Sequence, residues 1–260
     1  MKSPLNYFGG KSKLAKQIVA MIPEDHNCYC EAFSGAAWVL FNKEPSKAEV
    51  INDMDMELVT FWRVIQNHLQ PFLEHYKYAI VSRKIFDWEQ MKRPETLTDI
   101  QRAVRYFYLQ RLSFGGRTDS RRTFGVCVQS PTGLNLSTVE ERLLDVHWRL
   151  ERVTIEHLDA CDCIQRYDRP ENLFYLDPPY FETAQHYAAK FGPADFDRLR
   201  ELLSSIKGRF ILSLNDHAGV RKLFEKFNMT SVQLTYSASN GRSAPGNRSV
   251  PRNELLIRNW

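Results

Sequence analysis

The sequence predicts an α/β fold that carries an inserted, mostly helical domain. Short apolar runs alternate with helix-spaced segments over residues 1–69 and again over residues 151–260. Residues 70–150 lack this alternation and combine helical stretches with a polar loop. We therefore expect one sheet domain built from the two outer parts of the chain, interrupted by an insertion at 70–150.

The predicted elements follow one another in a regular order. Apolar residues at helical spacing indicate the helices, and short runs of apolar and β-branched residues indicate the strands. Before the insertion these are helix 11–21, strand 28–33, helix 36–42, strand 49–52 and a long helix after Asp53. Within it, helices 98–112 and 138–150 flank the loop 113–137. After it come strand 153–157, helix 160–166, strand 172–176, helix 195–206, strand 209–214, helix 217–227, strand 230–236, loop 237–251 and strand 254–257.

Composition limits the kind of protein that this chain forms. Apolar residues make up 43% of the 260 residues and charged residues 25%, as in ordinary globular domains. No apolar run approaches the ~18 residues of a membrane span, and we expect neither a membrane association nor a secretory signal. The five cysteines are odd in number and lack zinc spacing, so reduced thiols, a cytoplasmic location and no metal are expected. The net charge of +4 permits a polyanionic partner.

The most informative segment is Asp177-Pro178-Pro179-Tyr180, which directly follows the apolar run 173–176. The run is predicted as a buried strand, and open α/β sheets bind ligands beyond the carboxyl ends of their strands. The segment offers a carboxylate, a backbone carbonyl on a rigid turn and an aromatic ring. These groups suit a planar amine that is held by its N–H groups and stacked, such as the exocyclic amino group of a nucleobase.

Two further segments indicate a nucleotide-type cofactor site. Phe33-Ser34-Gly35 is a tight turn after the first strand, and Asp53 ends the second strand, where an acid can bind ribose hydroxyls. Near the N-terminus, Tyr7 and Lys11 flank paired glycines that let backbone N–H groups approach a ligand. The fingerprint G-x-G-x-x-G is absent, which argues against a nucleotide-dependent oxidoreductase.

Arginines cluster in and beside the two long loops. Arginine side chains suit phosphates and guanine edges, so these loops are predicted to bind nucleic acid. The arginines concerned are Arg111, Arg117, Arg121, Arg122, Arg242 and Arg248.

Taken together, these segments resemble the Dam-like, D12 class of DNA adenine-N6 methyltransferases. The shared order is Y-F-G-G-K at 7–11, then F-S-G, Asp53, the insertion and D-P-P-Y; the likeness extends to 210–215 and 253–259. It implies a Rossmann-like S-adenosylmethionine-dependent methyltransferase sheet, with 1–69 and 151–260 as the catalytic domain and 70–150 as the target-recognition domain. A monomer acting in a bacterium, or encoded by a phage, is expected.

The resemblance also implies roles for single residues. Those that would contact S-adenosylmethionine are Tyr7, Lys11, Phe33, Ser34, Gly35, Asp53, Asp162 and Asp177. Residues 177–180 would hold an adenine that is flipped out of double-stranded DNA, or that lies in a single strand. Asp177 and the Pro178 carbonyl would accept its N6 hydrogens, beside Pro179, and Tyr180 would stack on the base.

Two departures from the family pattern bear on these roles. The family's F-x-G-x-G turn has Ala37 at its second glycine, which is small enough for us to expect cofactor binding. The GATC-reading members share R-x-N-x-x-G-x-F-N-V-P in the recognition loop, of which this chain keeps Arg117, Phe124 and Val126. Both site-specific and relaxed recognition therefore stay open, with Phe124 among the expected nucleic-acid contacts.

Three other functions remain open at this point. The same amine-holding groups serve cytosine N4 and RNA adenine, so residues 177–180 alone do not separate these substrates. A nucleic-acid-binding protein without catalysis is the third alternative. The presence of Asp53 and of Y-F-G-G-K beside D-P-P-Y favours an enzyme, because a binding module needs none of the cofactor residues.

Overall fold

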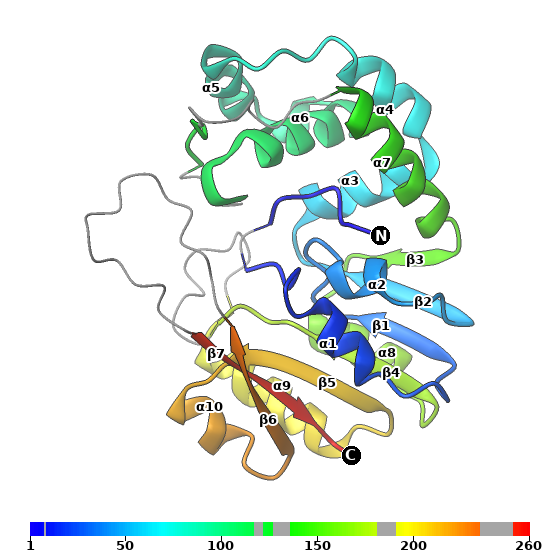
Figure 1. The fold of residues 1–260 in the computed structure, drawn as a ribbon, viewed down its shortest axis with the longest axis vertical. Helices are drawn as coiled ribbons and strands as arrows, with labels where there is room; N and C mark the ends of the chain where they lie inside the picture. Colours follow the sequence, from blue (N-terminus) through cyan, green and yellow to red (C-terminus); the bar gives the residue numbers. More distant parts are fainter. Residues whose placement is uncertain (8, 117–121, 127–135, 181–190, 235–251) are drawn as a thin grey trace.

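The computed structural model describes residues 1–7, 9–116, 122–126, 136–180, 191–234 and 252–260. Within these ranges the chain forms a sheet of seven strands in the order β3-β2-β1-β4-β5-β7-β6 (Figure 1). All neighbours are parallel except β7, which is antiparallel to both β5 and β6. The strands are β1 (Cys28–Glu31), β2 (Ala48–Asn52), β3 (Val153–Glu156), β4 (Asn172–Leu176), β5 (Arg209–Asn215), β6 (Asn228–Leu234) and β7 (Arg252–Arg258).

This strand order confirms the predicted Rossmann-like fold. It is the doubly wound order 3-2-1-4-5-6 with one antiparallel strand placed between the last two. The order reverses between β1 and β4, which pair in parallel. Ligands of such sheets bind where the order reverses, beyond the carboxyl ends of the strands. The turn 33–35 follows β1 and Asp177 follows β4, so both stand at this point.

Both faces of the sheet are covered by helices, in three layers. In β4, Leu173 and Tyr175 face an apolar cluster that includes α1 (Ala15–Ala20), α2 (Trp38–Asn42) and α3 (Met56–Asn67). Phe174 and Leu176 face a second cluster that includes α8 (Ala160–Tyr167), α9 (Pro193–Ser205) and α10 (Ala218–Leu223). A strand buried on both faces has no polar side, which explains the unbroken apolar run before Asp177.

The inserted region packs against α3 beyond the β3 edge of the sheet (Figure 1). Its helices are α4 (Leu69–Tyr76), α5 (Arg83–Met91), α6 (Asp99–Leu112) and α7 (Leu136–Leu150). Phe107 of α6 stacks on Phe61 of α3, with ring centroids 5.4 Å apart. Short 3-10 turns occupy Pro94–Thr96 and Phe114–Gly116. No helix in the described part of the chain is long and apolar enough to cross a membrane.

The long helix predicted after Asp53 is interrupted at His68. His68 has φ −137° and ψ 37°, so α3 ends at Asn67 and α4 begins anew at Leu69. Neither α4 nor α5 was predicted from the sequence. Ser82, whose side chain accepts a hydrogen bond from the N–H of Ile85, caps α5, and Thr98 with Gln101 forms a capping box at the start of α6.

Candidate active site

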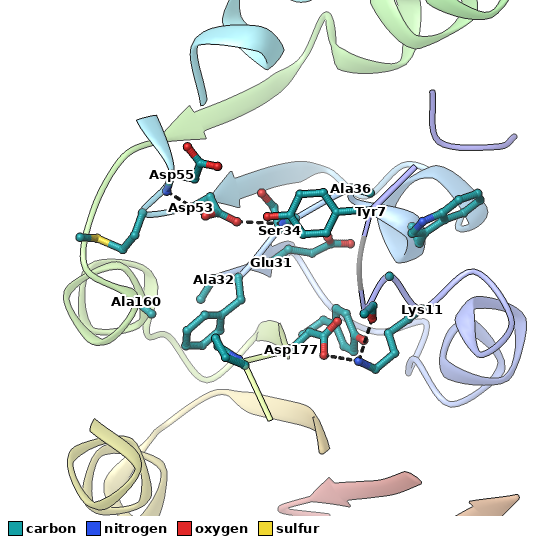
Figure 2. Close-up of a pocket in the computed structure, with 18 of the residues that line it drawn as sticks. Tyr7, Lys11, Glu31, Ala32, Ser34, Ala36, Asp53, Asp55, Ala160 and Asp177 are labelled. Carbon is teal, nitrogen blue, oxygen red and sulfur yellow. Dashed lines mark hydrogen bonds and ion pairs between the residues drawn. The ribbon is translucent and has the colours of Figure 1, made fainter. Parts of the chain in front are cut away.

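A cavity of about 260 Å³ lies where the strand order reverses (Figure 2). Its wall combines the N-terminal segment, the turn after β1, the end of β2, the start of α8 and the end of β4. The sequence-predicted residues in this wall are Tyr7, Lys11, Phe33, Ser34, Gly35, Asp53, Asp177 and Pro179. The fold thus gathers into one cavity residues that are up to 172 positions apart, from Tyr7 to Pro179.

The turn after β1 is tied to the end of β2. The N–H of Ser34 donates to the carbonyl of Asn52 (2.8 Å), and the N–H of Gly35 donates to the Asp53 carboxylate (2.9 Å). Gly35 has φ +46°, and a Cβ built there would lie 3.1 Å from the Tyr7 ring. A larger residue at 35 would therefore be strained and would push Tyr7 out of the cavity wall.

Two carboxylates stand together at one end of the cavity. Asp53 also accepts from the N–H of Asp55 (3.0 Å), and Asp55 caps α3 by accepting from the N–H of Glu57 (3.0 Å). Burial raises the pKa of Asp53 to about 6, while the N–H groups of Asp55 and Gly35 hold it down. Asp53 is therefore ionised at neutral pH and can accept hydrogen bonds from vicinal hydroxyls.

Lys11 and Asp177 form a buried ion pair at the other end of the cavity (Figure 2). The ammonium nitrogen lies 2.6 Å from Oδ1 of Asp177 and 4.8 Å from the centroid of the Tyr180 ring. Burial raises the pKa of Asp177, and Lys11 counteracts that rise. Burial alone would lower the pKa of Lys11, but Asp177 makes the net shift upward. The pair is therefore charged, and Asp177 is an acceptor.

Pro178 and Tyr180 belong to the same D-P-P-Y segment as Asp177. Pro178 is buried and lies outside the cavity lining. Tyr180 is half-buried, and its hydroxyl donates to Glu254 of β7. The tyrosine ring is therefore held from two sides, by Lys11 over its face and by Glu254 at its hydroxyl.

Several groups in the wall were not predicted as site residues. Glu31, the last residue of β1, is buried in the wall and accepts from the N–H of Leu40 (2.6 Å) and the hydroxyl of Tyr29 (2.9 Å). Burial raises its pKa to about 8. Its position just before Phe33-Ser34-Gly35 was the available signal. The other lining residues that were not predicted as site residues are Gly9, Gly10, Ala32, Ala36, Trp38, Val39, Met54, Asp55, Asp159, Ala160, Tyr175, Phe191 and Asp195.

Asp162 does not lie where the resemblance implies. Its side chain is exposed and is absent from the cavity lining. Asp159, one turn earlier, lines the cavity and caps α8 by accepting from the N–H of Cys161 (2.9 Å).

The predicted nucleic-acid contacts are described only in part. Arg111 is half-buried in the last turn of α6, and the guanidinium of Arg122 lies 5.5 Å from the centroid of the Tyr106 ring. Phe124 packs edge-on against Phe86 at 5.5 Å between centroids. The four remaining arginines lie outside the described residues: Arg117, Arg121, Arg242 and Arg248.

A model of the family described as D12 class N6 adenine-specific DNA methyltransferase matches residues 7–238. The chain is 24% identical over 265 residues to the type II methyltransferase M.CviBI of Paramecium bursaria Chlorella virus NC1A, with 100% of both chains covered. It is 24% identical over 254 residues to the DNA adenine methylase of Haemophilus influenzae, covering 90% and 87%. Similar solved structures include a SAM-dependent O-methyltransferase from Thermotoga maritima, at 13% identity and a TM-score of 0.40, covering 95% of this chain and 64% of that one.

Proposed function

Because the chain belongs to the D12 class of N6 adenine-specific DNA methyltransferases, we propose that residues 177–180 hold the target adenine beside the cavity that holds the cofactor. Members of this family are specific for adenine N6 in DNA, so the enzyme transfers a methyl group from S-adenosylmethionine to DNA adenine, and the cytosine, RNA and non-catalytic alternatives are removed. The observation that carries the proposal is the ion pair between Lys11 and Asp177. It joins the Y-F-G-G-K segment at 7–11 to the D-P-P-Y segment at the wall of one cavity.

The cavity wall fits S-adenosylmethionine chemically. A Cβ at Gly10 would lie 3.0 Å from the Trp38 ring and from the Tyr7 carbonyl, so only glycine lets this part of the wall pack so closely. Asp53 offers its carboxylate to ribose hydroxyls, and Lys11 offers an ammonium to the methionine carboxylate. We assign the acid at the adenine end of the cofactor to Asp159 in place of Asp162, since Asp159 is the one in the wall.

S-adenosylmethionine supplies an electrophilic methyl group on its sulfonium. Adenine N6 is a weak nucleophile because its lone pair is delocalised into the ring. The Asp177 carboxylate and the Pro178 carbonyl accept the two N6 hydrogens, which favours a pyramidal nitrogen with a localised lone pair. Tyr180 stacks on the flipped base and offsets part of the few kcal/mol lost by unstacking. Positioning of the two bound reactants supplies most of the rate.

Replacement of Asp177 tests this assignment. We expect Asp177→Ala and Asp177→Asn to lower tritiated-methyl transfer to DNA below detection while the far-ultraviolet circular dichroism spectrum is kept. Asp197→Ala, which changes an exposed aspartate of α9, is the matched control and should keep full activity. Near-normal activity of both Asp177 variants would refute the role of this carboxylate.

The finer substrate properties form part of the same proposal. We propose that a monomer acts on double-stranded DNA in the cytoplasm of a bacterium or of a phage-infected cell, with site-specific or relaxed recognition. The relatives are named from a chlorella virus and from bacteria. Single-molecule sequencing of DNA from expressing cells reports the modified base and its context together. Sedimentation with a short duplex tests the stoichiometry, and a 2:1 complex would contradict the monomer.

A further inference from the structure

Ser213 stands directly beside Asp177. Leu176 of β4 lies opposite Leu212 of β5, so Asp177 and Ser213, the next residues on two parallel strands, are neighbours. The Ser213 hydroxyl donates to Oδ1 of Asp177 at 3.1 Å, and the side chain of Ser213 is 0% exposed. Oδ1 also accepts from Lys11, at 2.6 Å. Both described donors therefore hold the same carboxylate oxygen.

A second hydroxyl, that of Tyr175, contacts Ser213, and Tyr175 itself lines the cavity. The Tyr175 hydroxyl lies 3.0 Å from Oγ of Ser213, and Tyr175 is buried one position before the end of β4. Burial raises the pKa of Tyr175 well above its ordinary value, so this hydroxyl keeps its proton. A serine has one hydrogen to donate. The Leu176 carbonyl is the more distant acceptor for this hydrogen, at 3.5 Å against 3.1 Å for the Asp177 carboxylate. With Ser213 donating to Asp177, Tyr175 donates to Ser213, and the contacts run toward the carboxylate.

We propose that Ser213, supported by Tyr175, is a positioning residue that holds Oδ1 of Asp177 in the cavity wall and leaves Oδ2 to accept a hydrogen from adenine N6. This rests on the proposed role of Asp177. The Asp177 side chain is 19% exposed, although its Oδ1 is enclosed by Lys11 and Ser213. The accessible oxygen is therefore Oδ2, because both hydrogen bonds that Asp177 accepts within the described residues end on Oδ1.

The charges around Asp177 set the pH dependence of this arrangement. Lys11 from the N-terminal segment and the hydrogen bond from Ser213 both hold the pKa of Asp177 down against burial. Glu31 on β1 and Tyr175 on β4 face it within electrostatic reach, and Glu254 on β7 faces Lys11. Loss of the Ser213 hydroxyl removes one of the two described groups that lower this pKa. The carboxylate then protonates at a higher pH.

Single-turnover methylation by Ser213→Ala, Tyr175→Phe and the double variant tests the proposal. We expect Ser213→Ala to lower the rate about tenfold, as for loss of a hydrogen bond to a charged group, with unchanged S-adenosylmethionine affinity. The acid limb of its pH–rate profile should move to higher pH. Tyr175→Phe should slow wild type about threefold but the Ser213→Ala background less than twofold, since it acts through Ser213.

Ser231→Ala is the matched control, because it removes another serine–aspartate hydrogen bond (Ser231 to Asp216, 3.0 Å) from the same sheet. It should change neither rate nor profile. Ser213→Thr keeps the hydroxyl and should restore most of the rate. An unmoved acid limb in Ser213→Ala, or fully additive losses in the double variant, would overturn the inference. If Ser213→Ala gave one of these results while Asp177→Asn was inactive, the proposed role of Asp177 would stand and only the positioning role of Ser213 would be rejected.

Discussion

Ala37 is a residue in the left-handed region of the backbone, with φ +51°, at the position where the family pattern has its second glycine. A Cβ is unfavourable in that conformation, whereas glycine adopts it freely. We expect Ala37→Gly to raise the free energy of unfolding by about 1 kcal/mol, since the relief of strain exceeds the entropy that glycine loses on folding. Urea denaturation measures the change.

The neighbouring alanine supplies the control for this prediction. Ala36 is buried and is not among the positive-φ residues of the described chain, so Ala36→Gly should lower stability. If Ala37→Gly lowered the denaturation midpoint as well, the backbone at 37 would not be strained.

Asp53 links cofactor binding to pH. Burial raises its pKa to about 6, and only the ionised form accepts two ribose hydrogens. As pH falls from 7.5 to 5.5 the carboxylate gains a proton that binding must release, so S-adenosylmethionine affinity should fall about fourfold. Calorimetry at the two pH values measures this change. Asp53→Asn should bind S-adenosylmethionine more weakly and lose this part of the pH dependence. If the variant kept the same fall in affinity between the two pH values, another group would be responsible for it.

At the scale of elements, the inserted helices and the sheet share one apolar cluster. Phe61 of α3 and Phe107 of α6 belong to the same cluster as Leu173 and Ile211 of the sheet. We propose residues 70–150 as the target-recognition domain, and we expect it to unfold together with the sheet. Circular dichroism and tryptophan fluorescence should therefore give coincident urea transitions. Two separated transitions would show that the insertion is independent.

Replacing Phe107 tests how strongly this shared apolar cluster stabilises the fold. It is buried and contacts Phe61, Phe72 and Tyr76 through its ring. We expect Phe107→Ala to lower the free energy of unfolding by about 3–5 kcal/mol, and the whole transition should shift. Trp148 of α7 is 62% exposed, so Trp148→Ala should change stability by less than about 0.5 kcal/mol.

The sequence was sufficient for the strands and for the cavity residues that follow them. Each predicted strand is present with its ends moved by at most two residues, because apolar runs and the turns after them are local signals. Ser213 and Glu254 were not recognised as site residues, since their roles depend on the register of β5 and β7 against β4. Asp162 was named from the resemblance and Asp159 was not, because the position of a residue after a strand does not show whether its side chain enters the cavity.

At the scale of the whole molecule, the net charge of +4 is too small to explain DNA binding by itself. The predicted arginine loops must supply the phosphate contacts, and about five such contacts would reduce affinity by roughly 10²- to 10³-fold between 50 and 200 mM salt. Fluorescence anisotropy with a labelled duplex measures this slope. Replacing Arg117, Arg121, Arg242 or Arg248 singly by Gln should reduce the slope of log Kd against log salt by about one.

Lys47 gives the control for that measurement. It is exposed and precedes β2, at the edge of the sheet opposite to the cavity, so Lys47→Gln should leave the slope unchanged. A slope equally reduced by Lys47→Gln would mean that the charge acts through the field of the whole protein. A slope unchanged by all four arginine variants would move the DNA away from these loops. The described arginines Arg111 and Arg122 would then be the next residues to replace.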